Sequence, residues 1–478
     1  MSNQEKVDRA AREALRLLGA DPANWVQPAP GTDYDVAVVG GGQSGTAIGF
    51  ALRRAGIARF TVIDAADEGQ AGGWLTRARM VTLRTPKTRS GPELDIPALG
   101  FQAWYEGLHG AEAFDAIGRI ARTDWADYLA WYQRQVGVPV RHRTRLTDIE
   151  PLSGGGLRLR LLADGEETTE TVRKVILANG VEGTGGPFVP DIFKELPASL
   201  YAHTGHAIDF AALRGKSVGI LGAATSALDA AATALEAGAA EVHLFSYRPQ
   251  LVIAGVSVQN PGARDNFYHQ SDAFRWRARY RAQAAGSSSP LDSVLRAVRF
   301  PEFNLHLSAP WHGVRDAGGR VMAEAADGTF TFDFVIVGTG YQYDPATRPE
   351  LRRIAGDIAL WRDRYQPPQE EASEAVGLVP YLGPGYQFLE KVPGTAPWLA
   401  DIHVFNAAAS QSFGRPVGDI PSLRTGVPRL VDAIGRDLFF ADQARENPAL
   451  KPATAPAESH FDKYAHAIWR PADHAAAR

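Results

Sequence analysis

The chain has 478 residues, of which 45% are hydrophobic and 22% are charged, and its formal net charge is −4. This composition is ordinary for globular proteins, excludes a wholly disordered chain and, at roughly 150 residues per domain, predicts two to three domains. The near-neutral charge gives no electrostatic footprint for nucleic acid. The absence of cysteine excludes disulfides, thiolate metal sites, cysteine nucleophiles and dithiol redox relays.

The N-terminal segment predicts a short amphipathic helix and linker within residues 1–29. Its apolar side chains share one helical face: Val7, Ala11, Ala14, Leu15 and Leu18. We expect this face to pack on the main body, with partner binding as the alternative. The segment lacks the pattern of a secretory signal, and no apolar run approaches the ~18 residues of a membrane span. We therefore expect a cytoplasmic protein without membrane contacts, and homo-oligomerisation stays open.

Residues 34–64 carry the fingerprint of a dinucleotide-binding unit. An apolar strand runs into the G-x-G-x-x-G sequence of residues 40–45 (the first turn), and a helix and a second strand follow. The second strand closes on Asp64, near the spacing of ~20 residues expected for a carboxylate that binds a ribose. A glycine-rich turn of another α/β protein is the alternative.

Each residue of the first turn has a physical role. Gly40 makes the tight turn out of the strand, Gly42 lets the backbone approach a pyrophosphate, and Gly45 lets the helix approach the strand. Gln43 and Ser44 stand at the helix N-terminus, where free N–H groups and the positive end of the dipole favour phosphate.

A second unit of the same kind lies between residues 217 and 245. Its turn, GAATSA at residues 222–227 (the second turn), has alanine at the second and third glycine positions. These residues are small enough to permit the same backbone path. The nucleotide contacts expected here are Gly222, Thr225 and Ser226.

The loop after the second strand of this unit predicts the preferred coenzyme. It has no acid for a ribose and offers Arg248. A guanidinium suits a 2′-phosphate through bidentate contacts, which favours NADPH over NADH. A surface arginine without a ligand is the alternative.

Two predicted strands that end in glycine, at 174–180 and 332–340, lie before and after the second nucleotide-binding unit. We expect the chain to cross between the units at these strands, so that the second unit is inserted within the first domain. The predicted fold class is α/β, with two nested Rossmann-like dinucleotide-binding domains. The predicted domains are 1–29 (N-terminal helix and linker), 30–195 (FAD-binding, first part), 205–330 (NAD(P)H-binding), 331–445 (FAD-binding, second part, with substrate-side loops) and 446–478 (C-terminal tail).

Two dinucleotide sites in one chain predict two redox cofactors, FAD in the first and NADPH in the second, with hydride transfer to the flavin. The absence of cysteine excludes a disulfide reductase, which leaves quinones, metals or O₂ as electron acceptors. A flavin oxidoreductase that reduces a quinone or O₂, and a nucleotide-binding protein without turnover, are alternatives to an oxygenase. We expect no metal site, because the paired histidines His203 and His206 have no carboxylate cluster beside them.

Over residues 33–445 the sequence resembles the class B flavoprotein monooxygenases, which include flavin-containing, N-hydroxylating and Baeyer–Villiger enzymes. The resemblance rests, in order, on the first turn, Gly72-Gly73-Trp74, LANG at 177–180, the second turn and GTGY at 338–341. It implies FAD, NADPH and O₂, a C4a-hydroperoxide on the reduced flavin, and oxygenation of a small molecule. It also implies that Trp74 contacts FAD and that Leu146 lies on the adenine side.

The subclass motifs favour oxygenation of a heteroatom. The Baeyer–Villiger pattern F-x-G-x-x-x-H-x-x-x-W keeps only its histidine, at His203. Residues 80–87 are similar to a stretch of amino-acid N-hydroxylases in which a lysine holds the substrate carboxylate. This makes Lys87 the candidate substrate-binding residue, with a solvated basic loop or FAD-phosphate contacts as the alternative. Residues 406–414 resemble the flavin-side loop of the same enzymes.

We therefore expect N-hydroxylation or N-oxidation of an amine or amino compound. Baeyer–Villiger oxidation or S-oxygenation is one alternative, and an NAD(P)H oxidase or quinone oxidoreductase is another. No general acid or base can be named from the sequence.

Overall fold

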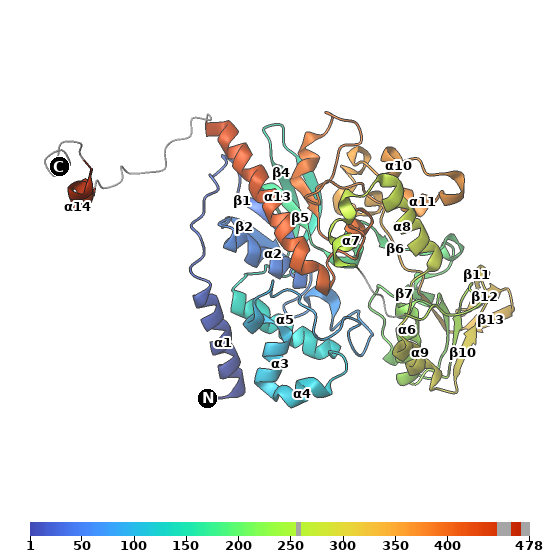
Figure 1. The fold of residues 1–478 in the computed structure, drawn as a ribbon. Coiled ribbons are helices and arrows are strands. Elements are labelled where there is room, and N and C mark those ends of the chain that lie inside the picture. The colour runs from blue at the N-terminus through green and yellow to red at the C-terminus, as the bar shows by residue number, and fades with distance from the viewer. Residues whose placement is uncertain (255–259, 447–459, 470–478) are drawn as a thin grey trace. The chain divides into compact units, whose positions relative to one another are not determined.

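The computed structural model describes residues 1–254, 260–446 and 460–469 (Figure 1). The chain divides into two compact parts, Met1–Asp437 and Leu438–Arg478, and both sheets that carry the fingerprints lie in the first. Most of the predicted C-terminal tail, at 447–459 and 470–478, lies outside the described residues. In the described part of the chain, no helix is both long and apolar enough to cross a lipid bilayer.

The first fingerprint lies in a six-stranded sheet, called here the first sheet. Its strands are β1 (Tyr34–Val39), β2 (Phe60–Ile63), β3 (Thr144–Pro151), β4 (Leu157–Ala163), β5 (Glu166–Leu177) and β16 (Ile402–Val404). β1 pairs in parallel with β2 and β5, and β16 adds in parallel to β5. The N-terminal half of β5 forms an antiparallel meander with β4 and β3. The strands of the parallel part therefore end at one edge.

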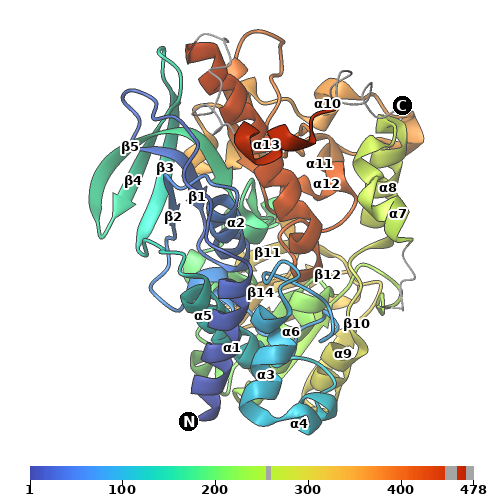
Figure 2. The ribbon, with the colours of Figure 1, turned by 60° about the vertical axis from the view of Figure 1, so that its left-hand side comes forward.

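Of the helices from the N-terminal third, α2 (Gln43–Arg54) packs against this sheet, and the others lie together below it in the view of Figure 2. The others are α1 (Asn3–Leu17), α3 (Phe101–His109), α4 (Ala111–Ala116) and α5 (Arg122–Val136). α2 buries Ile48, Phe50 and Leu52, as a helix enclosed by sheet and neighbours must. α1 begins at a capping box of Ser2 and Glu5 and buries its apolar face against α3 and α5.

The second fingerprint lies in a five-stranded parallel sheet, called here the second sheet. Its order is β10 (Phe303–His306), β9 (Glu241–Phe245), β8 (Ser217–Leu221), β14 (Phe334–Val337) and β7 (Tyr201–His203). α6 (Thr225–Glu236) and α9 (Leu291–Val298) pack together on it. An antiparallel sheet of β11 (Trp311–Asp316), β12 (Val321–Ala325) and β13 (Gly328–Phe332) leads back into β14.

The chain leaves the first sheet after β5 and returns to it at β16, so the second sheet interrupts the first. The short strands β6 (Gly186–Pro187) and β15 (Tyr341–Gln342) pair where the two connections pass each other. This topology confirms the predicted α/β fold class with nested Rossmann-type domains.

The segment between β9 and β10 also contributes α7 (Pro261–Asp265) and α8 (Asp272–Ala285). α8 does not cover the second sheet; its Trp276 packs with Trp361, Val376 and Val379 of the later chain. That later region holds α10 (Trp361–Arg364), α11 (Glu374–Gly377), α12 (Ser410–Phe413) and the start of α13 (Ile420–Glu446). Residues from the inserted segment therefore pack against the chain between β15 and β16.

Candidate active site

The first turn has the backbone shape that its glycines require. Gly40 has a φ of 110°, in the left-handed region that disfavours a β-carbon, and its N–H donates to the carbonyl of Ile63 at 2.7 Å. A β-carbon on Gly45 would lie 1.8 Å from the carbonyl oxygen of Gly40. The helix can approach the strand this closely only because residue 45 has no side chain.

Asp64 locks this turn to the end of β2. Its carboxylate accepts the N–H of Gly41 at 2.7 Å and the N–H of Ala66 at 2.8 Å. The backbone of Asp64 also pairs with Arg141 and Thr144, which lead into β3. The half-buried carboxylate therefore lies at the carboxyl edge of the first sheet, where an acid can accept from a ribose.

The N-terminus of α2 is open to an anion. In the described ranges no side chain caps this helix, so the N–H groups at its start have no side-chain partner and can bind an anion. The side chains of Gln43 and Ser44 turn to the C-terminal chain: Gln43 Nε2 donates to the carbonyl of Gly418 at 2.8 Å, and Ser44 Oγ lies 3.5 Å from it. The backbone, more than these side chains, could hold a pyrophosphate.

A glycine pair brings the next segment against this turn. A β-carbon on Gly42 would lie 3.4 Å from the Cα of Gly72, so these backbones nearly touch. Trp74 follows, packs edge-on to Trp125 with 6.5 Å between ring centroids, and has its carbonyl bound by Arg122. The close approach of the 72–74 segment completes a cradle that fits FAD.

Leu146 lies farther along the same edge. It is buried in β3, opposite Leu161 of β4 and two residues after Thr144. Its position next to the Asp64 end of the cradle is compatible with the predicted adenine contact, which stays a prediction.

Asn406 opens the segment 406–414 that the sequence predicts on the flavin side, although it was not itself predicted as a contact residue. It follows β16 and is 1% exposed; its Nδ2 donates to the carbonyl of Leu177 at 3.2 Å and to Asn179 Oδ1 at 3.1 Å. This ties the ends of β5 and β16 together beside the cradle. Its place directly after a buried strand is the signal that could have identified it.

The second turn repeats the geometry of the first in a looser form. Gly222 has a φ of 110° and donates its N–H to Phe245 at 2.9 Å, and its missing β-carbon would lie 2.4 Å from the carbonyl oxygen of Gly338. Thr225 is buried and its Oγ1 donates to Ser288 at 3.1 Å, whereas Ser226 is exposed. Among the described residues no side chain caps α6, so this N-terminus can also receive a phosphate.

Arg248 lies at the C-terminal end of α8. Its guanidinium donates to the carbonyl of Ala284 at 2.8 Å and lies 5.0 Å from the centroid of the Tyr247 ring. A guanidinium has five N–H donors, so these contacts do not use all its capacity. Its role toward a 2′-phosphate stays a prediction.

The amino group of Lys87 already has hydrogen-bond partners within the protein. Its Nζ donates to the carbonyls of Phe114 at 2.6 Å and Asp115 at 3.1 Å, at the C-terminal end of α4, and lies 4.5 Å from the Phe114 ring centroid. A cation is stabilised at such a helix end. To bind a substrate carboxylate, Lys87 would have to leave these carbonyls.

His203 is fully buried at the end of β7. Its Nδ1 accepts the N–H of Gly205 at 2.9 Å, and its ring meets Tyr341 edge-on at 5.3 Å. Burial, helped by the nearby His206 and Arg79, lowers its pKa to about 4. The imidazole is therefore neutral at pH 7.

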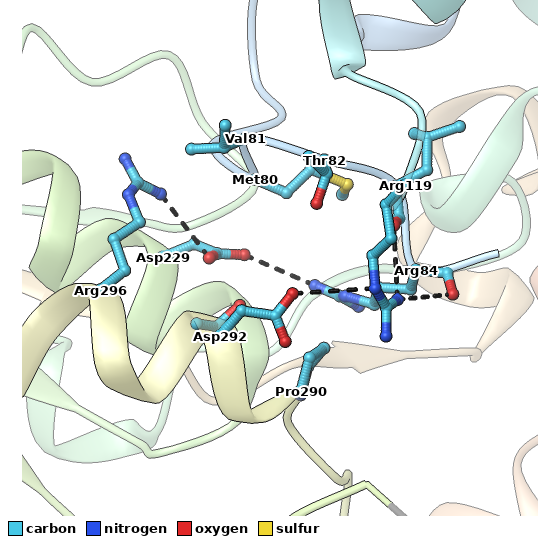
Figure 3. Close-up of a pocket in the computed structure, with 11 residues that line it drawn as sticks. Met80, Val81, Thr82, Arg84, Arg119, Asp229, Pro290, Asp292 and Arg296 are labelled. Carbon is cyan, nitrogen blue, oxygen red and sulfur yellow. Dashed lines mark hydrogen bonds and ion pairs between the residues drawn. The ribbon is translucent and has the colours of Figure 1, made fainter. Parts of the chain in front are cut away.

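A buried carboxylate lies between two arginines at the junction of the sheets (Figure 3). Asp229 of α6, which is 3% exposed, lies 3.6 Å from Arg84 and 3.7 Å from Arg296, and these residues line a cavity of about 80 Å³. Burial raises the pKa of Asp229 and lowers that of Arg84. Asp229 was not predicted, because its partners come from distant segments. The described residues contain no His, Asp and Glu cluster that could hold a metal.

Comparisons with known proteins agree with this geometry. Residues 37–182 match the FAD-NAD(P)-binding family, and residues 114–289 match the L-lysine 6-monooxygenase/L-ornithine 5-monooxygenase family. The FAD-dependent urate hydroxylase of Xanthomonas campestris pv. campestris is 38% identical over 446 residues, which cover 92% of this chain and 93% of that protein.

Solved structures share the fold at lower identity. The reduced form of ornithine hydroxylase from Pseudomonas aeruginosa superposes with a TM-score of 0.66 at 18% identity, covering 85% of this chain and 99% of its own. L-lysine 6-monooxygenase from Pseudomonas syringae gives 0.65 at 19% identity, with coverage of 84% and 99%.

Proposed function

Because this chain belongs to the class B flavin-dependent monooxygenases, we propose that it uses NADPH and O₂ to hydroxylate urate or a closely related oxidised purine. The observation that carries this proposal is the 38% identity to a urate hydroxylase, which extends over 92% of the chain and includes both turns. Recognition and chemistry depend on segments spread over that whole length. The ornithine and lysine hydroxylases with solved structures are 16% to 19% identical.

FAD, when bound, supplies the redox chemistry: it takes an electron pair from NADPH and activates O₂. In the overall reaction one oxygen atom enters the substrate, the other leaves as water, and NADPH becomes NADP⁺ with uptake of one proton. The uncapped N–H groups at the start of α2 would hold the FAD pyrophosphate, and Asp64, which already accepts the N–H of Gly41, would accept from the ribose. The second turn and Arg248 bind NADPH. Asn406 fixes the two strand ends beside the flavin.

N-hydroxylation of an amine on an amino acid is the second candidate, and it is the subclass that the sequence motifs favour. The match of residues 114–289 to the lysine and ornithine monooxygenases supports it. The contacts of Lys87 count against it, because the predicted carboxylate ligand already binds two carbonyls of α4. The two candidates differ in the atom that is oxidised and in the role of Lys87.

The test compares substrates on the FAD-loaded wild-type enzyme. NADPH oxidation, O₂ uptake, peroxide release and product are followed with urate, ornithine, lysine, a sulfide and a ketone. We expect urate to disappear in a 1:1 ratio with NADPH and with little peroxide. Product from an amine and none from urate would favour the second candidate. Peroxide without any organic product would indicate an NAD(P)H oxidase.

A substitution at Lys87 separates the two candidates further. If urate is the substrate, Lys87→Met leaves its KM within about twofold. If an amino acid is the substrate, loss of a charged hydrogen bond raises its KM at least about tenfold. Lys194→Met is the matched control, because Lys194 is an exposed lysine that forms an ion pair with Asp191 at 3.0 Å.

A further inference from the structure

The short helix α12 (Ser410–Phe413) carries buried polar atoms without partners. Gln411 is 3% exposed and Ser412 is 0% exposed. Neither the amide nitrogen and oxygen of Gln411 nor the hydroxyl of Ser412 has a hydrogen-bond partner among the described residues. Buried polar groups in proteins are nearly always paired, because leaving them unpaired forfeits their hydration. Three such atoms on consecutive residues indicate a ligand.

The neighbouring polar groups are satisfied, so poor packing of the whole segment does not explain the unpaired atoms. Ser410 Oγ donates to the carbonyl of Ala407 at 2.6 Å and accepts the N–H of Val417 at 3.3 Å. The Nδ2 group of Asn406 donates two hydrogen bonds, and its Oδ1 accepts the N–H of Ala408 at 3.0 Å. Among residues 406–413, only the side chains of Gln411 and Ser412 have buried polar atoms without partners.

α12 stands where the two cofactor-bearing halves meet. It follows β16, whose carboxyl end lies with those of β1 and β5 at the ligand edge of the first sheet. It also packs against α8, which lies beside it in Figure 2, and against the turn Phe267–His269 of the inserted segment. Phe413 stacks on Tyr268 with 5.1 Å between ring centroids. α12 therefore lies between the carboxyl edge of the first sheet and the inserted segment.

We propose that Gln411 and Ser412 bind the substrate through a lactam edge, an N–H and a C=O side by side in a ring. A glutamine amide offers a donor and an acceptor next to each other, and a serine hydroxyl can serve as either. Oxidised purines present such edges, whereas a protonated alkyl amine offers hydrogen-bond donors and no acceptor for the amide N–H. A site built to pair with these groups discriminates strongly against compounds that lack them. The inference rests on the proposed function and names its recognition group.

Flavin also has a lactam edge, so the test measures cofactor and substrate separately. Gln411→Glu replaces the amide donor by an acceptor of the same shape, and Ser412→Ala removes only the hydroxyl. Gln369→Glu on the exposed turn Gln369–Glu371 is the matched control. For each variant, FAD content, thermal midpoint, the rate of anaerobic flavin reduction by NADPH, and the Kd of urate for the oxidised holoenzyme are measured.

We expect Gln411→Glu to raise the Kd of urate at least about tenfold, and Ser412→Ala about threefold to tenfold. FAD content and the rate of flavin reduction should stay within twofold of wild type, as should every value for Gln369→Glu. The inference is overturned if both variants bind urate like wild type, or if they lose FAD and keep their affinity for urate. A wild-type enzyme that binds urate without hydroxylating it contradicts the proposed function and leaves this binding test intact.

Discussion

The two nucleotide-binding turns start in the same way and close differently. In both, the first glycine has a φ of 110° and donates its N–H to the end of the neighbouring strand, at 2.7 Å for Gly40 and 2.9 Å for Gly222. The first turn then tolerates no β-carbon at Gly45, whereas the second accommodates the methyl group of Ala227 against Gly338.

A carboxylate adds to this difference. Asp64 binds two backbone N–H groups at the first turn, while the corresponding loop of the second sheet offers Ser246 and Arg248. The first turn is thus fixed by a carboxylate as well as by its strand. The second has the N–H of Gly222 bound to the end of β9 and the hydroxyl of Thr225 bound to a backbone carbonyl, and no such carboxylate among the described residues. We interpret the tighter turn as the site of a resident FAD and the looser one as the site of a coenzyme that exchanges in every cycle.

The largest effect that tests this difference between the two turns is expected from Gly45→Ala. Its β-carbon would lie 1.8 Å from a backbone oxygen, which cannot move aside as the end of a flexible side chain can. Overpacking typically costs about 1–3 kcal/mol, and a backbone clash lies at the upper end of this range. We expect the variant to be purified without flavin absorbance and with a lowered thermal midpoint.

Ala227→Gly is the control for that experiment. It removes a methyl group that the second turn accommodates, at a cost of about 1 kcal/mol for glycine in a helix. FAD content should match wild type, and the KM for NADPH should change by less than about threefold, since the effect on this helix is small. Equal loss of flavin in both variants would show that the turns are equally constrained.

The next largest effect concerns a buried histidine in each sheet. His403 of β16 is fully buried and donates through Nδ1 to the carbonyl of Gly385 at 2.8 Å. Burial lowers its pKa to about 4, with Lys174 adding to the shift. Because the folded pKa is below the unfolded value of about 6.5, this group stabilises the fold above pH 6.5 and the stabilisation is lost as the pH falls through 4.

Substitution His403→Asn keeps a donor for Gly385 and removes the titration. Between pH 6.5 and pH 4 the wild type should lose about 3 kcal/mol through this residue, at about 1.4 kcal/mol per pH unit, and the variant should not. Urea unfolding at several pH values measures the slope. His203→Asn, in the second sheet, should likewise reduce the loss of stability between pH 6.5 and pH 4. If the free energy of unfolding falls equally steeply with pH in wild type and both variants, the two histidines are not buried in the neutral form.

Much of this architecture was predictable because the determining physics is local. Gly40, Gly45 and Asp64 follow each other at fixed spacing, and each meets a steric or hydrogen-bonding demand within one βαβ unit. The small residues at 224 and 227 could likewise be interpreted without a fold.

The residues that the sequence did not identify depend on distant partners. Asn406 meets Asn179 across 227 positions, and Asp229 meets Arg84 only after the two sheets pack. Lys87 shows the same difficulty, since a lysine in a loop has the same local sequence whether it awaits an anion or caps the end of α4.

A smaller effect is expected from Arg248→Gln. If the guanidinium binds the 2′-phosphate, its loss should raise the KM for NADPH by about tenfold to a hundredfold, the range for hydrogen bonds to charged groups, and leave the KM for NADH nearly unchanged. Steady-state kinetics with both coenzymes measures this selectivity. Arg320→Gln is the matched control, because Arg320 pairs with Asp333 on the same half of the chain. An equal rise in KM for NADPH and NADH would mean that Arg248 has a structural role, through its hydrogen bond to the carbonyl of Ala284.

The smallest effect concerns the contact that joins the two halves. Arg84 is 45% exposed on its side chain and lies 3.6 Å from Asp229, so Arg84→Gln should cost less than about 1 kcal/mol, and less still at high salt. Asp229 retains Arg296 at 3.7 Å, which limits the loss further. Thermal midpoints at low and high salt measure the change, with Arg119→Gln as the control at the neighbouring Asp292 pair. A loss of several kcal/mol would mean that this single ion pair holds the sheets together, and the looser second turn would then owe its position to Asp229 rather than to the packing of α6.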